Sequence, residues 1–204
     1  MPTLGHMPRP PRIQVPGGIY HVNTKGCAER FIFRDDIDRT SFEEILALVV
    51  RNHEWLCSSF CLMGTHYHLL LTTPNGDLAA GMQRLNSLYA QTFNRRHGAA
   101  GHLFMGRYHS EFIQTDSHLL ETTRYVALNP VRAGLCERPE DWPWSSFAET
   151  IGKRPARPYV ASDVLLALFA DDPELARARF YAFVQAASPA RPLTGSDPVT
   201  VYGV

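Results

Sequence analysis

The chain has 204 residues, 45% of them hydrophobic and 20% charged, and its 20 Lys and Arg residues balance its 20 Asp and Glu residues. This composition excludes a disordered polymer, because such chains contain few hydrophobic residues and carry a large net charge. The lack of a basic excess excludes a protein that coats nucleic acid or a membrane surface through bulk charge.

The N-terminal segment, residues 1–17, holds five prolines and is predicted to be an extended arm. Prolines stand where a secretory signal needs an apolar helix, and no stretch approaches the ~20 apolar residues that cross a bilayer. We therefore expect a cytoplasmic protein without a membrane partner. The four cysteines form no C-x-x-C pair and are expected to be reduced, mostly buried thiols.

Three elements are predicted before residue 74. Residues 18–23 (GIYHVN) have the β-branched and aromatic composition of a short strand. Aspartates at 35, 36 and 38 can cap a helix that extends to about Asn52, with apolar residues at helical spacing on one face. Trp55–Met63 and His66–Thr73 are strand candidates joined by Gly64-Thr65, which predicts an antiparallel hairpin.

The elements that follow complete a recognisable order. A second helix is expected up to about His97, then a Gly-rich loop and a strand over Arg107–Gln114. A third helix begins near Asp116, and Pro130 is expected to end it at Asn129. The order β-α-β-β-α-β predicts an α+β, ferredoxin-like split βαβ fold, with a four-stranded antiparallel sheet and two helices on one face.

The rest of the chain is predicted to be an extension of this domain. The segment Trp142–Trp144 is expected to pack back on the domain, and Gly152–Pro158, basic and rich in proline, is interpreted as a linker. Two short helical patterns follow, at about 161–170 and 172–187, and the tail from 188 to 204 is expected to be loose. The predicted divisions are thus an arm (1–17), a main domain (18–150) and an extension (151–204).

The triplet His66-Tyr67-His68 is the first candidate for chemistry. Alternation along a strand directs both histidines to the same face, ~6 to 7 Å apart, where they could share a metal ion. The spacing alone is a weak signal. Two half-buried histidines on a sheet surface would give the same pattern.

The third helix supplies the second candidate. Its polar stripe contains Tyr125 and Asn129, which stand one turn apart on one face. A tyrosine phenol can act as a covalent nucleophile, and an amide oxygen can bind a hard metal ion. The alternative is a tyrosine packed where helix and sheet meet, with Asn129 as the residue before Pro130.

Several separated blocks then carry a family resemblance. In order they are PRIQVPGGIYHV, CLMGTHYHLLL, NRRHGAAGHLFMGRYHS, RYVALNPVRAG and DWPWSSF. Over about residues 8–148 the chain resembles the REP-associated tyrosine transposases, within the single-tyrosine HUH endonucleases. Residues 150–204 lie outside this resemblance.

The resemblance implies roles for particular residues. His66 and His68 match the two histidines of the HUH motif, Tyr125 matches the nucleophile, and Asn129 matches the third metal ligand, so that Mg²⁺ or Mn²⁺ is the expected cofactor. The middle position of the motif is usually aliphatic and is Tyr67 in this chain. By strand alternation Tyr67 should face away from both histidines, so we do not assign it as the nucleophile.

The implied partner is single-stranded DNA with hairpin repeats, cleaved and rejoined through a 5′-phosphotyrosine by a nucleoid-associated monomer or homodimer. Residues 81–110 carry four arginines and no acidic residue, a local charge of +4. Arginine suits phosphate and guanine contacts, although a solvated helix face would give the same pattern. The candidate DNA contacts are Arg9 and Arg12 in the arm, with Arg95, Arg96, Arg107 and Tyr108 in the basic segment.

Two other functions compete with this interpretation. A DNA-binding module that has lost cleavage would keep the fold, and a two-histidine metal phosphoesterase would use water on a small substrate. The first does not explain why Tyr125, Asn129 and both histidines are all present, and the second leaves Tyr125 without a role.

Overall fold

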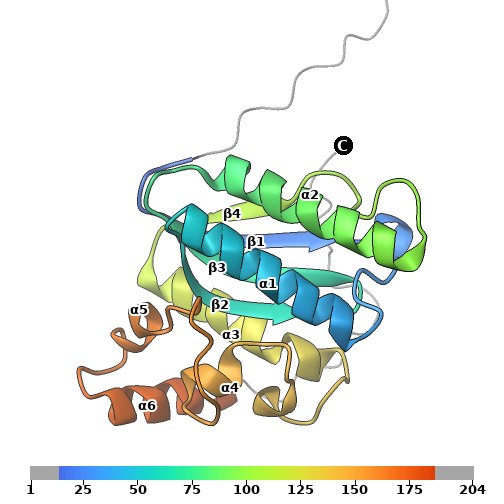
Figure 1. Ribbon diagram of the computed structural model, residues 1–204. Helices are drawn as coiled ribbons and strands as arrows, with labels where there is room; N and C mark the ends of the chain where they lie inside the picture. Colours follow the sequence, from blue (N-terminus) through green and yellow to red (C-terminus); the bar gives the residue numbers. More distant parts are fainter. Residues whose placement is uncertain (1–13, 187–204) are drawn as a thin grey trace, which may run out of the picture.

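Four antiparallel strands form one sheet in the computed structural model, which describes residues 14–186 (Figure 1). Neighbouring strands follow the order β2-β3-β1-β4. The strands are β1 (Gly18–Lys25), β2 (Leu56–Leu62), β3 (His66–Thr73) and β4 (His109–Ile113). The architecture confirms the predicted α+β fold with an antiparallel sheet. Arg9, Arg12, most of the predicted arm and the tail from 188 lie outside the described residues.

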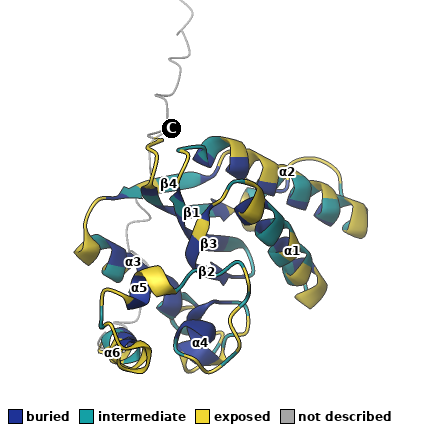
Figure 2. Ribbon diagram, turned by 60° about the vertical axis from the view of Figure 1, so that its left-hand side comes forward, coloured by how far each residue is buried: buried dark blue, intermediate teal, exposed yellow. Residues whose placement is uncertain are grey.

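Two long helices cover one face of the sheet and a third covers the other (Figures 1 and 2). They are α1 (Asp36–Asn52), α2 (Leu78–His97) and α3 (Asp116–Arg132). Strand alternation explains the two layers. Tyr67 and Leu69 of β3 belong to the core shared with α1 and α2, whereas Leu70 packs with Leu119 of α3. His66 and His68 alternate with Tyr67 and Leu69 along β3 and therefore point toward the α3 side, as Leu70 does.

Local capping sets where these helices begin. The side chain of Asp35 accepts a hydrogen bond from the backbone N–H of Asp38, 3.0 Å away, which confirms the predicted cap of α1. Thr115 caps α3 by accepting from the N–H of His118 at 3.2 Å. Gly98 ends α2 with φ of 57°, a left-handed conformation that glycine adopts without steric cost.

The predicted end of α3 at Asn129 is wrong. The helix continues to Arg132 with Pro130 inside it. Proline lacks an N–H donor, but the carbonyls beside it are satisfied: that of Asn129 accepts from Ala133 at 3.0 Å, and that of Pro130 accepts from Leu135 at 2.9 Å at the end of the helix. Asn129 is consequently held in regular helix, one turn beyond Tyr125.

The C-terminal extension is bound to the main domain by several contacts. The Trp142 indole donates to the Leu62 carbonyl at 3.0 Å, which confirms that this segment packs back. The short elements in this region are η2 (Pro139–Asp141), α4 (Phe147–Thr150), α5 (Asp163–Leu166) and α6 (Pro173–Gln185), with η1 (Cys27–Glu29) earlier in the chain. Phe180 and Val184 of α6 pack against Ala127 of α3.

Residues 152–158, interpreted from sequence as a linker, are held against the main domain instead. Arg157 forms ion pairs with Glu43 of α1 and with Glu149, and its guanidinium lies 5.2 Å from the centre of the Phe60 ring. Val160 then forms a bridge with Cys57 of β2. Two of the charges that suggested a solvated linker are paired with carboxylates, Arg157 with Glu43 and Glu149 and Lys153 with Glu140, which sequence spacing could not reveal. The domain boundary at 150 remains a prediction.

None of the helices within residues 14–186 combines the length and hydrophobicity needed to span a membrane.

Candidate active site

The predicted site residues meet between β3 and α3. The Nε2 atom of His68 lies 3.0 Å from the Nδ2 atom of Asn129. The ring of Tyr125 stands edge-on to that of His68, with centroids 5.5 Å apart. The His66 ring is perpendicular to the His68 ring, with centroids 5.0 Å apart. One strand and one helix thus bring together the four residues that were identified from the sequence.

The two tyrosines near this motif differ in their surroundings. Tyr125 is 42% exposed, and the guanidinium of Arg132 lies 5.3 Å from its ring centre. Tyr67 is fully buried on the opposite face, where its hydroxyl donates to Asn86 at 2.5 Å and accepts from Thr24 at 2.9 Å. Burial raises the pKa of Tyr67. Of the two, Tyr125 is the tyrosine that is accessible from solvent.

Sequence reasoning missed a third histidine, His21 of β1. Its Nε2 atom lies 3.0 Å from Nδ1 of His68, and the two rings are stacked at 5.2 Å. On its other side, Nδ1 of His21 is 4.0 Å from Glu111 of β4, and Glu111 is 3.2 Å from Nε2 of His118. Alternation along GIYHVN predicts which residues share a face of the strand with His21. It does not predict which strand pairs beside it, because that strand is distant in the sequence.

Burial keeps the histidines of the site uncharged at neutral pH. The pKa of His68 is lowered well below its ordinary value, first by burial and then by the neighbouring His21 and His66. Burial also lowers the pKa of His66 to about 4, helped by Lys25, and the pKa of His21 to about 4, helped by His109 and His118. A neutral imidazole has a free lone pair, which is the form that binds metal ions.

The donor set suits a divalent ion held by nitrogen and amide ligands. Among residues 14–186, no group of three or more His, Cys, Asp or Glu side chains is arranged to hold a metal. The candidate ligands at this site are two neutral histidines, His66 and His68, and the side-chain amide of Asn129, which is a different type of ligand. Such a weakly charged set leaves coordination positions for a phosphate oxygen.

The lowered histidine pKa values predict acid-sensitive stability of the metal-free protein. Because His21 and His66 have a folded pKa of about 4 against 6.5 when unfolded, the unfolded chain binds more protons between these values. Stability present above pH 6.5 should therefore fall as the pH drops, by about 2 kcal/mol per histidine between pH 7 and 5. Urea unfolding in EDTA at both pH values measures the loss.

The variant His21→Gln is the control for this pH effect, because it removes one titrating group. Between pH 7 and 5, the free energy of unfolding of this variant should fall by about 2 kcal/mol less than that of the wild type. Equal losses in the two proteins would show that the buried His21 imidazole is not a source of the acid sensitivity.

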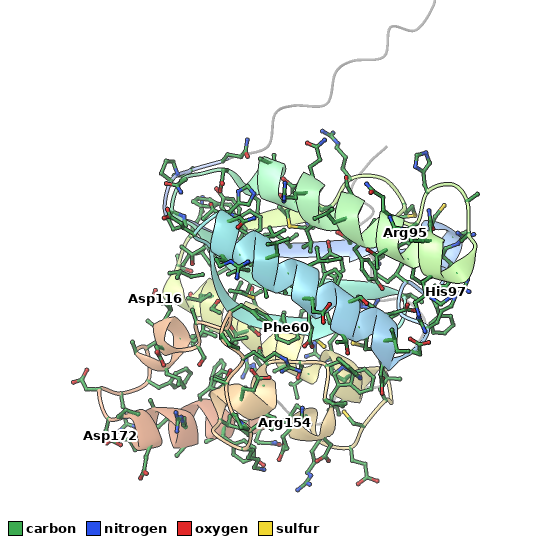
Figure 3. All side chains as sticks on the ribbon, viewed as in Figure 1. Phe60, Arg95, His97, Asp116, Arg154 and Asp172 are labelled. Atoms are coloured by element: carbon green, nitrogen blue, oxygen red, sulfur yellow. The ribbon has the colours of Figure 1, made fainter. Side chains whose placement is uncertain are left out.

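The described candidates for DNA contact lie on different elements and differ in exposure. Arg95 is exposed at the end of α2, in the layer across the sheet from α3 (Figure 3). Arg96, beside it, is paired with Asp35 and with the buried Asp38. Arg107 is exposed in the loop before β4, whereas Tyr108 is buried in the main core. The +4 segment is therefore not one basic surface beside the site, and DNA contact by these residues stays a prediction.

Comparison with known proteins places the chain among transposases. The family described as "Transposase IS200 like" matches residues 14–129, a span that includes His66, His68, Tyr125 and Asn129. A curated protein of Haemophilus influenzae, "Putative REP-associated tyrosine transposase", is 27% identical over 100 residues, which make up 44% of this chain and 57% of that protein. The chain thus matches little more than half of that relative's length.

A solved structure shares the fold. It is described as the REP-associated tyrosine transposase bound to a REP hairpin, and it superposes with a TM-score of 0.60 over 75% of this chain and 90% of its own. The sequence identity is 18%.

Proposed function

We propose, from the fact that this chain belongs to the IS200-like transposase family, that it cleaves and rejoins single-stranded DNA through a covalent bond to Tyr125. The observation that carries the proposal is the placement of an exposed tyrosine edge-on to His68, whose Nε2 atom faces Asn129. Nucleophile and metal ligands then act on the same phosphate.

The reaction exchanges one phosphodiester for another. The Tyr125 oxygen loses its proton and forms a bond to phosphorus, the bond to the 3′-oxygen breaks, and that oxygen leaves as a 3′-hydroxyl. A 5′-phosphotyrosine remains, and attack by a 3′-hydroxyl reverses the step and joins the strands. No water or nucleotide triphosphate is consumed, because the energy of the phosphodiester is kept in the link to the protein.

A divalent ion, Mg²⁺ or Mn²⁺, would be held by His66, His68 and Asn129 and would neutralise charge on the phosphate oxygens. The residues of the chain supply the positioning. Because Tyr125 and Asn129 are one turn apart on α3, the nucleophile is fixed relative to the ligand. Arg132, beside the Tyr125 ring, orients that ring and adds positive charge where DNA would approach.

Hairpin-forming repeats are the proposed substrate class. The solved relative is described as bound to a REP hairpin, and this supports the same class of DNA for this chain. A DNA-binding module without cleavage and a small-molecule phosphoesterase are the competing functions. Neither accounts for an exposed tyrosine that stands edge-on to His68.

A strand-cleavage assay tests the proposal. The protein is mixed with end-labelled single strands that contain the hairpin repeats flanking its own gene, with Mg²⁺ or Mn²⁺. We expect a protein–DNA adduct that survives SDS, release of a fragment with a free 3′-hydroxyl, and loss of both in EDTA. Binding without any cleavage would favour the silent module, whereas cleavage without an adduct would favour the phosphoesterase.

A further inference from the structure

His68 has a hydrogen-bond partner on each ring nitrogen. The amide nitrogen of Asn129 lies 3.0 Å from Nε2, and Nε2 of His21 lies 3.0 Å from Nδ1. An amide –NH₂ group can only donate, so Nε2 of His68 must accept and carries no proton. An imidazole whose Nε2 accepts must carry its proton on Nδ1, where it is donated to His21.

The proton on His21 is fixed in the same way. Its Nε2 atom accepts from His68, so its own proton lies on Nδ1, the atom that faces the Glu111 carboxylate at 4.0 Å. Glu111 also lies 3.2 Å from Nε2 of His118 on α3. A row of groups thus leads from an exposed carboxylate on β4, through His21 on β1, to the metal-ligand position on β3.

The surroundings of His21 support a role in this row. The residue is 8% exposed, and its ring lies nearly parallel to that of His68, at 18°. A buried polar side chain without a partner would be costly, and His21 is hydrogen-bonded to His68, with the Glu111 carboxylate 4.0 Å away on its other side.

We propose that His21 is a positioning residue, which holds His68 as the tautomer protonated on Nδ1. The lone pair of Nε2, which accepts from the Asn129 amide in this structure, is then the one available to a divalent ion. The inference rests on the proposed function, because it concerns the ligand set that would hold that ion. Groups that fix the tautomer of a histidine ligand typically change metal affinity by about 10–100-fold. His21 does not contact the ion or the DNA phosphate in this scheme.

Two substitutions separate hydrogen bonding from packing. His21→Phe keeps an aromatic ring against His68 but removes the acceptor. His21→Gln loses the ring but keeps an acceptor oxygen that can reach Nδ1 of His68. A purely structural role would be preserved better by Phe, whereas a tautomer-fixing role would be preserved better by Gln.

The decisive measurement is nitrogen NMR of the metal-free protein with labelled histidine, which reports directly which ring nitrogen carries the proton. The signals of His68 are assigned by their disappearance in His68→Ala. We expect Nδ1 protonated in the wild type and in His21→Gln. In His21→Phe the Nδ1 proton has no acceptor, whereas the Asn129 side chain can turn its amide oxygen toward Nε2 and accept a proton there, so we expect a shift toward the tautomer protonated on Nε2. A wild-type His68 protonated on Nε2 would overturn the proposal.

Binding of Mn²⁺ alone, followed by electron paramagnetic resonance, is the second measurement. We expect affinity about 10–100-fold weaker in His21→Phe and within about 3-fold of wild type in His21→Gln. Equal weakening in both variants would show that His21 only packs, and wild-type affinity in His21→Phe would remove its role. Thermal melting verifies that both variants are folded.

The two measurements also separate the role of His21 from the proposed function. If the wild type forms no DNA adduct and binds no Mn²⁺, the transposase mechanism fails, while the NMR experiment still decides the tautomer. If the adduct forms and the tautomer is wrong, only the role of His21 is lost.

Discussion

Replacing Tyr125 with Phe is expected to abolish the covalent protein–DNA adduct, lowering its rate of formation by at least about 10³-fold. Phenylalanine keeps the ring that lies 5.5 Å from His68 and 5.3 Å from the Arg132 guanidinium, so packing is retained. It lacks the oxygen that bonds to phosphorus, and no other group replaces it. The measurement is SDS gel electrophoresis of labelled single strands, with hairpin binding measured in parallel and expected to persist.

Tyr67→Phe is the matched control, because it makes the same chemical change one residue from each histidine. The Tyr67 hydroxyl is buried on the α2 side and bonds to Asn86 and Thr24. Its removal should cost about 1–3 kcal/mol of stability and leave adduct formation intact. An adduct of wild-type yield in Tyr125→Phe, or a loss confined to Tyr67→Phe, would show that the nucleophile has been assigned to the wrong tyrosine.

Replacing Arg157 with Met is expected to destabilise the fold by about 3–5 kcal/mol. The Glu149 side chain is 1% exposed and the Glu43 side chain 14% exposed, and both are paired with this guanidinium. Burial already raises the pKa of Glu43 against the opposing charge of Arg157. Without Arg157, two carboxylates would be left buried with no counter-ion. Urea unfolding at pH 7 measures the loss.

Arg154→Met provides the comparison on the same segment. Arg154 donates to the carbonyl of Pro143 at 3.1 Å, and its replacement should cost about 1 kcal/mol or less. Adding Glu43→Gln and Glu149→Gln to Arg157→Met should restore part of the lost stability, because the buried charges are then gone. If the triple variant is no more stable than Arg157→Met, unpaired charge is not the cause.

Local rules predicted the parts of the site that lie on one element. Alternation along β3 placed His66 and His68 on one face and Tyr67 on the other, and helical spacing placed Tyr125 and Asn129 together. Both relations depend only on periodicity within a strand or a helix. The family resemblance then joined the two pairs, and the structure brings His68, Tyr125 and Asn129 into contact distance.

The contacts that could not be predicted from the sequence are those between residues far apart along the chain. His21 lies beside His68 because two strands pair, and Arg96, a candidate for DNA contact, is bonded to Asp38, 58 residues away. Arg157 meets Glu43 over a separation of 114 residues. In each case a charged or polar residue that seemed available in the sequence is already bonded in the fold.

Because Tyr125 and Asn129 share α3, while His66 and His68 belong to the sheet, the site divides into two rigid halves. A displacement of α3 away from β3 would lengthen the attack distance and withdraw the third metal ligand in one movement. Since α6 packs on α3 through Ala127, and Arg124 lies 4.4 Å from the Phe183 ring, the C-terminal extension braces the helix that carries Tyr125 and Asn129 from outside the site.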